Sequence, residues 1–207
     1  MTEQGRTVFI VDDDPSFRKG IERLLRSCGF ATRCYQSAVE FVADHAPDTV
    51  GCVLADLRMP AMDGIALQRH LAGSANPLPV VFLTGQGDIP TSVEAMRCGA
   101  EDFLVKTAAK EAIIGAVERA LARTEAERRA RMRRLELEQC CARLTPRERE
   151  VLHHVLKGSR NRQIADALNI DERSVKRHRT NFMNKLGVGS VAELVQFAVE
   201  AGLSQPE

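Results

Sequence analysis

The chain has 207 residues, which is enough for one large domain or two smaller ones. With 44% hydrophobic and 28% charged residues, its composition is that of a folded globular protein and excludes a disordered chain. No apolar run approaches the roughly 20 residues that a membrane-spanning helix needs. Residues 1–6 are polar, which excludes a signal peptide, so we expect a cytoplasmic protein with no membrane partner.

Six cysteines occur without C-x-x-C spacing and without a cluster of histidines beside them. This pattern favours reduced thiols over a zinc site or a disulfide framework. The adjacent Cys140 and Cys141 could form a redox switch, but a packing role in a helix is the favoured interpretation.

The net charge of +1 conceals an asymmetry along the chain. Residues 1–115 carry 11 basic and 15 acidic side chains, whereas residues 157–185 carry 8 basic and 3 acidic ones. An acidic first half and a basic cluster near the end predict different partners for the two parts of the chain.

Short apolar runs alternate with amphipathic stretches over the first 110 residues. The predicted strands are Thr7–Val11, Ala31–Tyr35, Cys52–Ala55, Pro79–Leu83 and Asp102–Val105. The helical patterns cover residues 15–28, 37–45, 64–72, 90–98 and the chain from 110 onward. This alternation predicts an α/β fold with a doubly wound, five-stranded parallel sheet, and the continuous apolar runs suit strands that are buried on both faces.

One long helix is predicted from residue 110 to about 143, because this stretch has no proline, a single glycine and many alanine and charged residues. An apolar stripe marks its first turns, at residues 113–121. Further on, only Met132, Leu135 and Leu137 remain as large apolar side chains. This later part either pairs weakly with a partner chain or forms a solvated helical linker.

Residues 144–204 are predicted to form an all-α unit of four short helices. Thr145–Glu148 form a capping box that opens the first helix, Asn161 caps the second and Asp171 caps the third. The last three helices are predicted at about 162–168, 172–186 and 190–200.

Polar side chains follow four of the five predicted strands at the points where the strands end. In an open parallel sheet, ligands bind outside the carboxyl ends of the strands, and the residues that leave the strands there are Asp12, Asp13, Asp56, Thr84 and Lys106. Three clustered carboxylates repel one another unless a cation neutralises them, and oxygen ligands with open positions fit Mg²⁺. Together these residues suit phosphoryl transfer, with Asp56 as the nucleophile that forms an aspartyl phosphate. The alternative is that each acid only caps a helix or a turn.

Four motifs carry these residues: V-D-D-D-P, V-L-A-D-L-R-M-P-A-M-D-G, F-L-T-G-Q-G-D and D-F-L-V-K-T. Over about residues 5–122 they resemble the receiver domain of two-component response regulators, a CheY-like fold with strand order 2-1-3-4-5. The resemblance implies that Asp56 accepts phosphate from a sensor histidine kinase.

The same resemblance assigns roles to the surrounding residues. The ligands of Mg²⁺ would be Asp12, Asp13, Asp56 and the backbone carbonyl of Arg58. The switch and phosphate-binding residues would be Thr84, Phe103 and Lys106. One departure is Thr107, which stands where the family usually has a proline after a commonly cis bond. A non-proline cis bond costs about 3 kcal/mol, so either the Lys106–Thr107 bond is strained or the lysine is presented differently.

The third helix of the predicted all-α unit has one polar, cationic side. At 100° per residue, Val175, Phe182 and Leu186 fall together on the inner side. The residues on or at the margin of the opposite side are Arg173, Lys176, Arg177, Thr180, Asn181 and Asn184. A cationic, amide-bearing face after a helix and a short turn is typical of a reader of the DNA major groove, whereas the alternative is a solvated charged face.

The runs L-T-P-R-E-R-E-V-L, N-R-Q-I-A-D-A-L-N-I and D-E-R-S-V-K-R-H-R resemble the LuxR-type helix-turn-helix over residues 143–205. By this resemblance, residues 161–168 form the scaffold helix and residues 172–186 the recognition helix. His178 and Arg179 fall toward the apolar side, so we assign them to packing or to contacts with the DNA backbone.

The whole chain resembles a NarL/FixJ-family response regulator with a receiver at 1–122, a helical linker at 123–142 and a DNA-binding domain at 143–207. The implied function is that of a transcription factor. Phosphorylation of Asp56 would promote homodimerisation and binding to double-stranded DNA, with RNA polymerase as a further candidate partner. Beyond a slow loss of its own phosphate, no enzymatic activity is expected.

Two alternatives remain open. The first is an aspartate-nucleophile phosphatase, although Arg58 occupies the place where such enzymes have a second acid. The second is a phosphorylation-independent DNA-binding regulator with a receiver-like scaffold.

Overall fold

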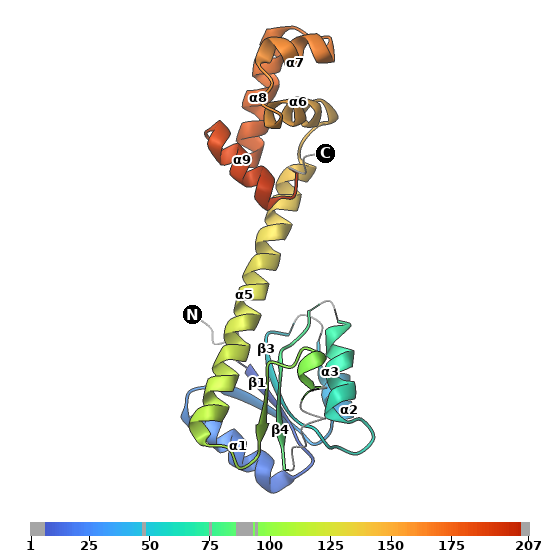
Figure 1. The fold of residues 1–207 in the computed structure, drawn as a ribbon, viewed down its shortest axis with the longest axis vertical. Coiled ribbons are helices and arrows are strands. Elements are labelled where there is room, and N and C mark those ends of the chain that lie inside the picture. Colours follow the sequence, from blue (N-terminus) through green and yellow to red (C-terminus); the bar gives the residue numbers. More distant parts are fainter. Residues whose placement is uncertain (1–6, 47–48, 75, 86–92, 94, 204–207) are drawn as a thin grey trace. The chain divides into compact units, whose positions relative to one another are not determined.

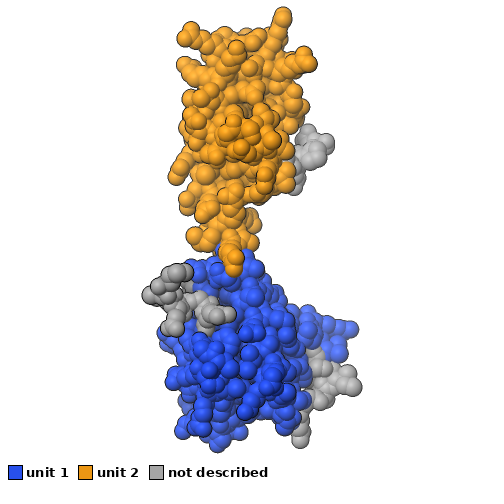
Figure 2. Space-filling view, turned by 90° about the vertical axis from the view of Figure 1, so that its left-hand side faces the viewer, with its two compact units in different colours: residues 1–128 blue, residues 129–207 orange. Residues whose placement is uncertain are grey.

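The computed structural model describes residues 7–46, 49–74, 76–85, 93 and 95–203. The chain divides into two compact units, residues 1–128 and residues 129–207 (Figure 2). No helix in these described ranges combines the length and the apolar character that crossing a lipid bilayer requires.

The first unit is built on a five-stranded sheet. Its strands are β1 (Thr7–Val11), β2 (Ala31–Tyr35), β3 (Gly51–Asp56), β4 (Val80–Thr84) and β5 (Asp102–Val105). All neighbouring strands are parallel and their order is β2-β1-β3-β4-β5, which confirms the predicted doubly wound topology (Figure 1). The structure starts β3 one residue before the prediction and ends it one residue after, and it shifts β4 one residue toward the C-terminus.

Helices cover both faces of this sheet (Figure 1). The helices of the first unit with described bounds are α1 (Pro15–Ser27), α2 (Ala38–Asp44), α3 (Gly64–Ala72) and the first part of α5 (Lys110–Ala142). Alternate residues of β1 show the two layers, because Phe9 and Val11 pack with α2 and α3 whereas Val8 and Ile10 pack with α1 and α5. The predicted helix at 90–98 includes residues 90–92 and 94, which lie outside the described residues.

A histidine is enclosed at the end of α2. The His45 ring stacks on Phe41 with 5.0 Å between ring centroids, and neither of its buried ring nitrogens has a hydrogen-bond partner among the described residues. Burial lowers the pKa of His45, and His70 adds a smaller lowering of the same pKa. The folded state therefore favours the neutral ring, whereas in the unfolded chain His45 takes up a proton near pH 6.5.

We expect His45→Phe to remove part of the acid sensitivity of the first unit. A group whose folded pKa is depressed binds more protons in the unfolded state, so its stabilising contribution is lost as the pH falls below about 6.5. The difference in the free energy of unfolding, variant minus parent, should therefore increase as the pH falls below that point, by at most about 1.4 kcal/mol per pH unit. Urea unfolding at pH 7.5 and pH 5 measures it, and equal pH slopes for the two proteins would contradict the prediction.

The helix α5 extends without a break over 33 residues and confirms the predicted long helix. Its first turns bury Ile113, Val117 and Leu121 in the core of the first unit. Near its other end, Leu137 is only 3% exposed and belongs to the core of the second unit. The segment predicted as a linker therefore contributes a core residue to the second unit.

We expect Leu137→Ala to lower the free energy of unfolding of the second unit by about 2–4 kcal/mol, because the change deletes a buried side chain and leaves a cavity. Leu135→Ala is the matched control, since Leu135 is 44% exposed two residues earlier on the same helix. The control should change the stability by less than about 0.5 kcal/mol. Thermal unfolding followed by circular dichroism distinguishes the two variants, and equal effects would contradict the assignment of Leu137 to the core.

The second unit completes its core with four further helices. They are α6 (Pro146–Leu156), α7 (Asn161–Leu168), α8 (Glu172–Leu186) and α9 (Val191–Glu200). The predicted capping box is present, with the Glu148 backbone N–H donating to Thr145 Oγ1 and the Thr145 backbone N–H donating to Glu148 Oε2. Asp171 caps α8 as predicted, by accepting from the Ser174 backbone N–H.

The prediction that Asn161 caps the second helix of this unit is wrong. The structure places Arg160 at the N-cap, where its backbone N–H donates to Gln163 Oε1 over 2.8 Å. Asn161 is instead the first helical residue, and its side-chain oxygen accepts a hydrogen bond of 2.7 Å from Arg179 of α8. That bond joins α7 to α8.

Candidate functional site

Three aspartates meet at the carboxyl ends of β1 and β3. Asp12 and Asp13 follow the last residue of β1, and Asp56 is the last residue of β3. One carboxylate oxygen of each lies within 4.8 Å of the other two. Asp12 and Asp56 are buried, whereas Asp13 is exposed. The register of adjacent parallel strands brings these acids together, since Val11 pairs with Ala55.

Lys106 links two of these acids. Its Nζ lies 2.7 Å from Asp12 Oδ2 and 2.7 Å from Asp56 Oδ2. The ammonium also lies 4.5 Å from the centroid of the Phe17 ring, which forms one wall beside it. These contacts hold the lysine at the acid cluster with its charge directed at both buried carboxylates.

The remaining carboxylate oxygens accept backbone hydrogen bonds. Asp12 Oδ1 accepts from the Asp14 backbone N–H over 2.9 Å, and Asp56 Oδ1 accepts from the Arg58 backbone N–H over 3.2 Å. The Arg58 backbone, predicted to offer its carbonyl to a metal, thus also donates to Asp56. The loop after β3 therefore lies directly beside the proposed nucleophile.

Burial and charge act against each other on the pKa values at this site. Burial raises the pKa of Asp12, and the hydrogen bonds from Lys106 and from the Asp14 N–H offset only part of that rise. Burial alone lowers the pKa of Lys106, but the Asp12 and Asp56 carboxylates raise that pKa above its usual value. Lys106 is consequently held in its charged form at neutral pH.

Thr84 and Phe103, the predicted switch residues, lie on adjacent strands. Thr84 ends β4 with 1% of its surface exposed, and its carbonyl accepts from the Lys106 backbone N–H over 2.7 Å. Phe103 is half-buried on β5, with its ring centroid 6.4 Å from that of Phe82. None of the peptide bonds in the described ranges is cis, so Lys106 reaches both carboxylates although its bond to Thr107 is trans.

A glycine allows the chain to pass close to Asp56. A Cβ atom at Gly64 would lie 2.7 Å from the Asp56 carbonyl oxygen and 2.7 Å from the Phe82 ring. Asp63 caps α3 by accepting from the Ala66 backbone N–H. Asp63 and Gly64 together therefore start α3 and allow its first turn to pack closely against the end of β3.

The donor set fits a divalent cation. It consists of three carboxylates, two of them buried, and hard oxygen ligands of this kind are those that Mg²⁺ prefers. Because one carboxylate stays exposed, solvent or a phosphoryl group has access to the cluster.

Two residues near the acids were not predicted from the sequence. Both lie on the first turns of α1, where Phe17 contacts Lys106 and the Arg18 guanidinium donates to the Asp12 carbonyl oxygen. In the sequence, only their position could have indicated this role. A helix that begins just after a strand starts at the edge of the sheet where that strand ends.

The second candidate site is the polar side of α8. Val175, Phe182 and Leu186 are buried as the helical spacing predicts. The residues predicted to contact DNA are all exposed: Arg173, Lys176, Arg177, Thr180, Asn181 and Asn184. His178 and Arg179 are half-buried, and the side chain of Arg179 hydrogen-bonds to Asn161 within the unit. The exposed cations and amides thus share one side of a helix whose other side forms the core.

An ion pair joins α8 to α6. Lys185 Nζ lies 2.7 Å from Glu148 Oε2, which joins α8 to the first turn of α6. Glu148 is only 3% exposed, so its charge is matched inside the unit by Lys185 and by the capping box.

Comparison with known proteins assigns each unit to a family. Residues 8–118 match the response regulator receiver domain, and residues 142–198 match the luxR family of bacterial regulatory proteins. The chain is 40% identical to the tetrathionate response regulatory protein TtrR of Salmonella typhimurium, over 92% of this chain and 90% of TtrR. It is 34% identical to the transcriptional regulatory protein FixJ of Bradyrhizobium diazoefficiens, over 98% of each chain. The solved structure of response regulator StyR is 43% identical, with a TM-score of 0.89 over 95% of this chain and 99% of that one.

The fold, the acid cluster and the matches define a regulator of two parts, a CheY-like receiver domain followed by a LuxR-type DNA-binding domain. Its full-length relatives are response regulators of transcription. The chain belongs to the NarL/FixJ family of two-component response regulators.

Proposed function

We propose that Asp56 is the residue that accepts the phosphoryl group from a sensor histidine kinase. The observation that carries this proposal is the placement of a buried carboxylate 2.7 Å from the Lys106 ammonium, beside two further acids. An Asp56 oxygen attacks phosphorus, the P–N bond to the kinase histidine breaks and a P–O bond to Asp56 forms. Lys106 then pairs with the phosphoryl oxygens, and the Thr84 hydroxyl donates a hydrogen bond to them.

The residues that would hold Mg²⁺ are Asp12, Asp13, Asp56 and the backbone carbonyl of Arg58. When bound, the ion supplies positive charge that offsets the repulsion between the acids and the incoming phosphoryl group. Asp13 suits this role because its exposed carboxylate borders the solvent side of the cluster. The family places the histidine kinase among the partners of the chain, and its slow loss of phosphate would be hydrolysis of the acyl phosphate at the same site.

The proposed output is DNA binding by a homodimer. Movement of Thr84 toward the phosphoryl group frees space into which Phe103 rotates, and this changes the surface around β5 through which two copies pair. Pairing adds the phosphate contacts of a second recognition helix, which raises the affinity for a two-fold DNA site. RNA polymerase is the further partner that a transcriptional regulator would meet on that DNA, and such a role places the protein in the cytoplasm.

We propose that residues 1–122 form the regulated receiver domain and that residues 143–207 form the DNA-binding domain. Residues 123–142 of α5 connect them. Leu137 supports a role for this segment beyond that of a spacer, because its side chain is buried in the second unit.

Beryllofluoride, a mimic of the phosphoryl group, tests the proposal on the full chain with Mg²⁺ present. We expect the mass in solution to double and the affinity for operator DNA to rise by a factor of about 5 to 150, the usual range of coupling between two sites. Unchanged mass and unchanged affinity would overturn the switch and favour a regulator that acts without phosphorylation.

A further inference from the structure

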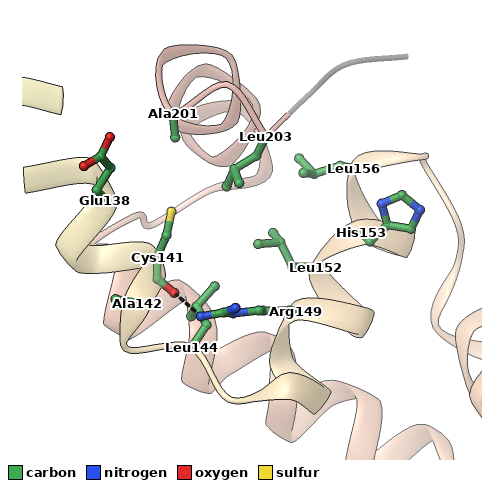
Figure 3. Close-up of a pocket in the computed structure, with 10 residues that line it drawn as sticks. All are labelled: Glu138, Cys141, Ala142, Leu144, Arg149, Leu152, His153, Leu156, Ala201 and Leu203. Atoms are coloured by element: carbon green, nitrogen blue, oxygen red, sulfur yellow. Dashed lines mark hydrogen bonds between the residues drawn. The ribbon is translucent and has the colours of Figure 1, made fainter. Parts of the chain in front are cut away.

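A cavity of about 500 Å³ lies within the second unit, and Figure 3 shows the residues that line it. Its walls come from the last turns of α5, from α6 and from the residues after α9, and α8 contributes none of the residues that line it. The volume is within the range of sites that bind small molecules.

The interior of the cavity is apolar. Leu152, Leu156 and Leu203 extend toward one another across it, and Leu144 and Ala201 contribute further apolar surface (Figure 3). Leu144 and Leu152 are each 5% exposed, so they form the floor, whereas Leu203 is 42% exposed at the opening. Apolar side chains that line an open space lack neighbouring atoms on that side, so an apolar ligand can supply the missing van der Waals contacts.

Charge at the edge of the cavity selects among apolar ligands. The exposed Arg149 guanidinium donates to the Cys141 carbonyl oxygen over 3.3 Å and forms no ion pair within the described ranges. Glu138 on the opposite wall is already paired with Arg134, whose Nε lies 2.9 Å from Glu138 Oε1. Of the arginine and the glutamate that line the pocket, Arg149 is thus the one without an oppositely charged partner in the part of the chain that the structure describes, and it favours an anionic group at this edge.

We propose that this cavity, which we call the leucine pocket, binds a small organic acid with an apolar body. The body would pack between the leucines and the carboxylate would pair with Arg149. Because the pocket joins α5, α6 and the end of α9, an acid bound there stabilises their packing.

The two adjacent cysteines of α5 provide an internal reporter. Cys141 lines the leucine pocket, whereas Cys140 lines a different cavity, between α5 and the residues of α8 and α9. Both are half-buried free thiols. A ligand in the leucine pocket shields one thiol and leaves its neighbour accessible.

The test uses the full chain, with decanoate as the acid and decanol as its uncharged counterpart. Alkylation by iodoacetamide is followed at each cysteine by mass spectrometry. We expect decanoate at ten times its Kd to slow the alkylation of Cys141 about tenfold and to leave Cys140 unchanged, as occupancy of one site requires. Decanol should protect Cys141 only at higher concentration.

Two arginine variants complete the design. Arg149→Gln should weaken the protection by decanoate about tenfold, the size expected for a charge-assisted hydrogen bond, without changing protection by decanol. Arg143→Gln is the matched control, because Arg143 is exposed nearby and does not line the pocket. Thermal unfolding should show that both variants are folded.

Each of the other outcomes overturns the proposal. No protection of Cys141 at about 1 mM decanoate would exclude such a ligand, since binding that weak is worth only about 4 kcal/mol. Equal protection of both cysteines would indicate a non-specific effect of a detergent-like acid. Protection that rises with protein concentration alone would show that a second copy of the chain covers the pocket.

Discussion

Replacing Asp56 by Asn is expected to abolish the incorporation of phosphate from a sensor kinase or from a small phosphodonor such as acetyl phosphate. The oxygen of the asparagine amide is not nucleophilic enough to attack phosphorus. The substitution also removes one of the two carboxylates that Lys106 contacts. The loss should be complete, because no other acid of the cluster lies at the end of β3. Gel separation of the phosphorylated and free chains measures it.

Asp63→Asn is the matched control for this experiment. Asp63 lies in the same loop, but its side chain caps α3. Among the described residues, the carboxylates that contact Lys106 are those of Asp12 and Asp56 and not that of Asp63. Asn is nearly as good an N-cap as Asp, so this variant should fold and accept phosphate normally. Undiminished phosphorylation of the Asp56→Asn variant would show that the phosphoryl group is carried elsewhere.

Removing two cations from α8 is expected to weaken DNA binding by about two orders of magnitude, since a contact to a base contributes about 1–3 kcal/mol and the loss of a phosphate contact weakens binding further. The variant is Lys176→Ala with Arg177→Ala, at two exposed positions of the helix. If both side chains contact phosphates, the slope of log affinity against log salt should decrease by about 2. Titrations at several salt concentrations, with duplexes selected from a random library by the parent protein, measure both quantities.

Its control removes the same charge from another helix. Arg131→Ala with Arg134→Ala changes two exposed arginines of α5, outside the polar side of α8. This control should leave affinity and salt slope close to those of the parent. Equal losses in the two double variants would mean that overall charge, rather than the face of α8, determines the binding.

The sheet and the acid cluster could be predicted from the sequence because both follow from the geometry of parallel strands. Apolar runs identify the strands, and the residues after them must converge at one edge, as Asp12 and Asp56 do. The contacts of Lys106 could not be predicted in the same way. Its position over the Phe17 ring depends on how α1 packs, which strand ends do not encode.

Two details of the second unit also escaped prediction. The spacing of apolar residues gave no reason to treat Leu137 differently from Leu135, yet only Leu137 is buried. Asn161 is the first helical residue and not the N-cap, and its side chain accepts a hydrogen bond from Arg179, 18 residues further along. The burial of Leu137 and the partner of Asn161 are both tertiary contacts, which local sequence patterns do not specify.

The bridge that Lys106 makes between two buried carboxylates has a consequence for the order of events at the site. One ammonium already offsets part of the repulsion between Asp12 and Asp56. Under the proposed function, Lys106 would exchange an internal ion pair for one with the incoming phosphoryl oxygens, so every transfer would rearrange the centre of the receiver.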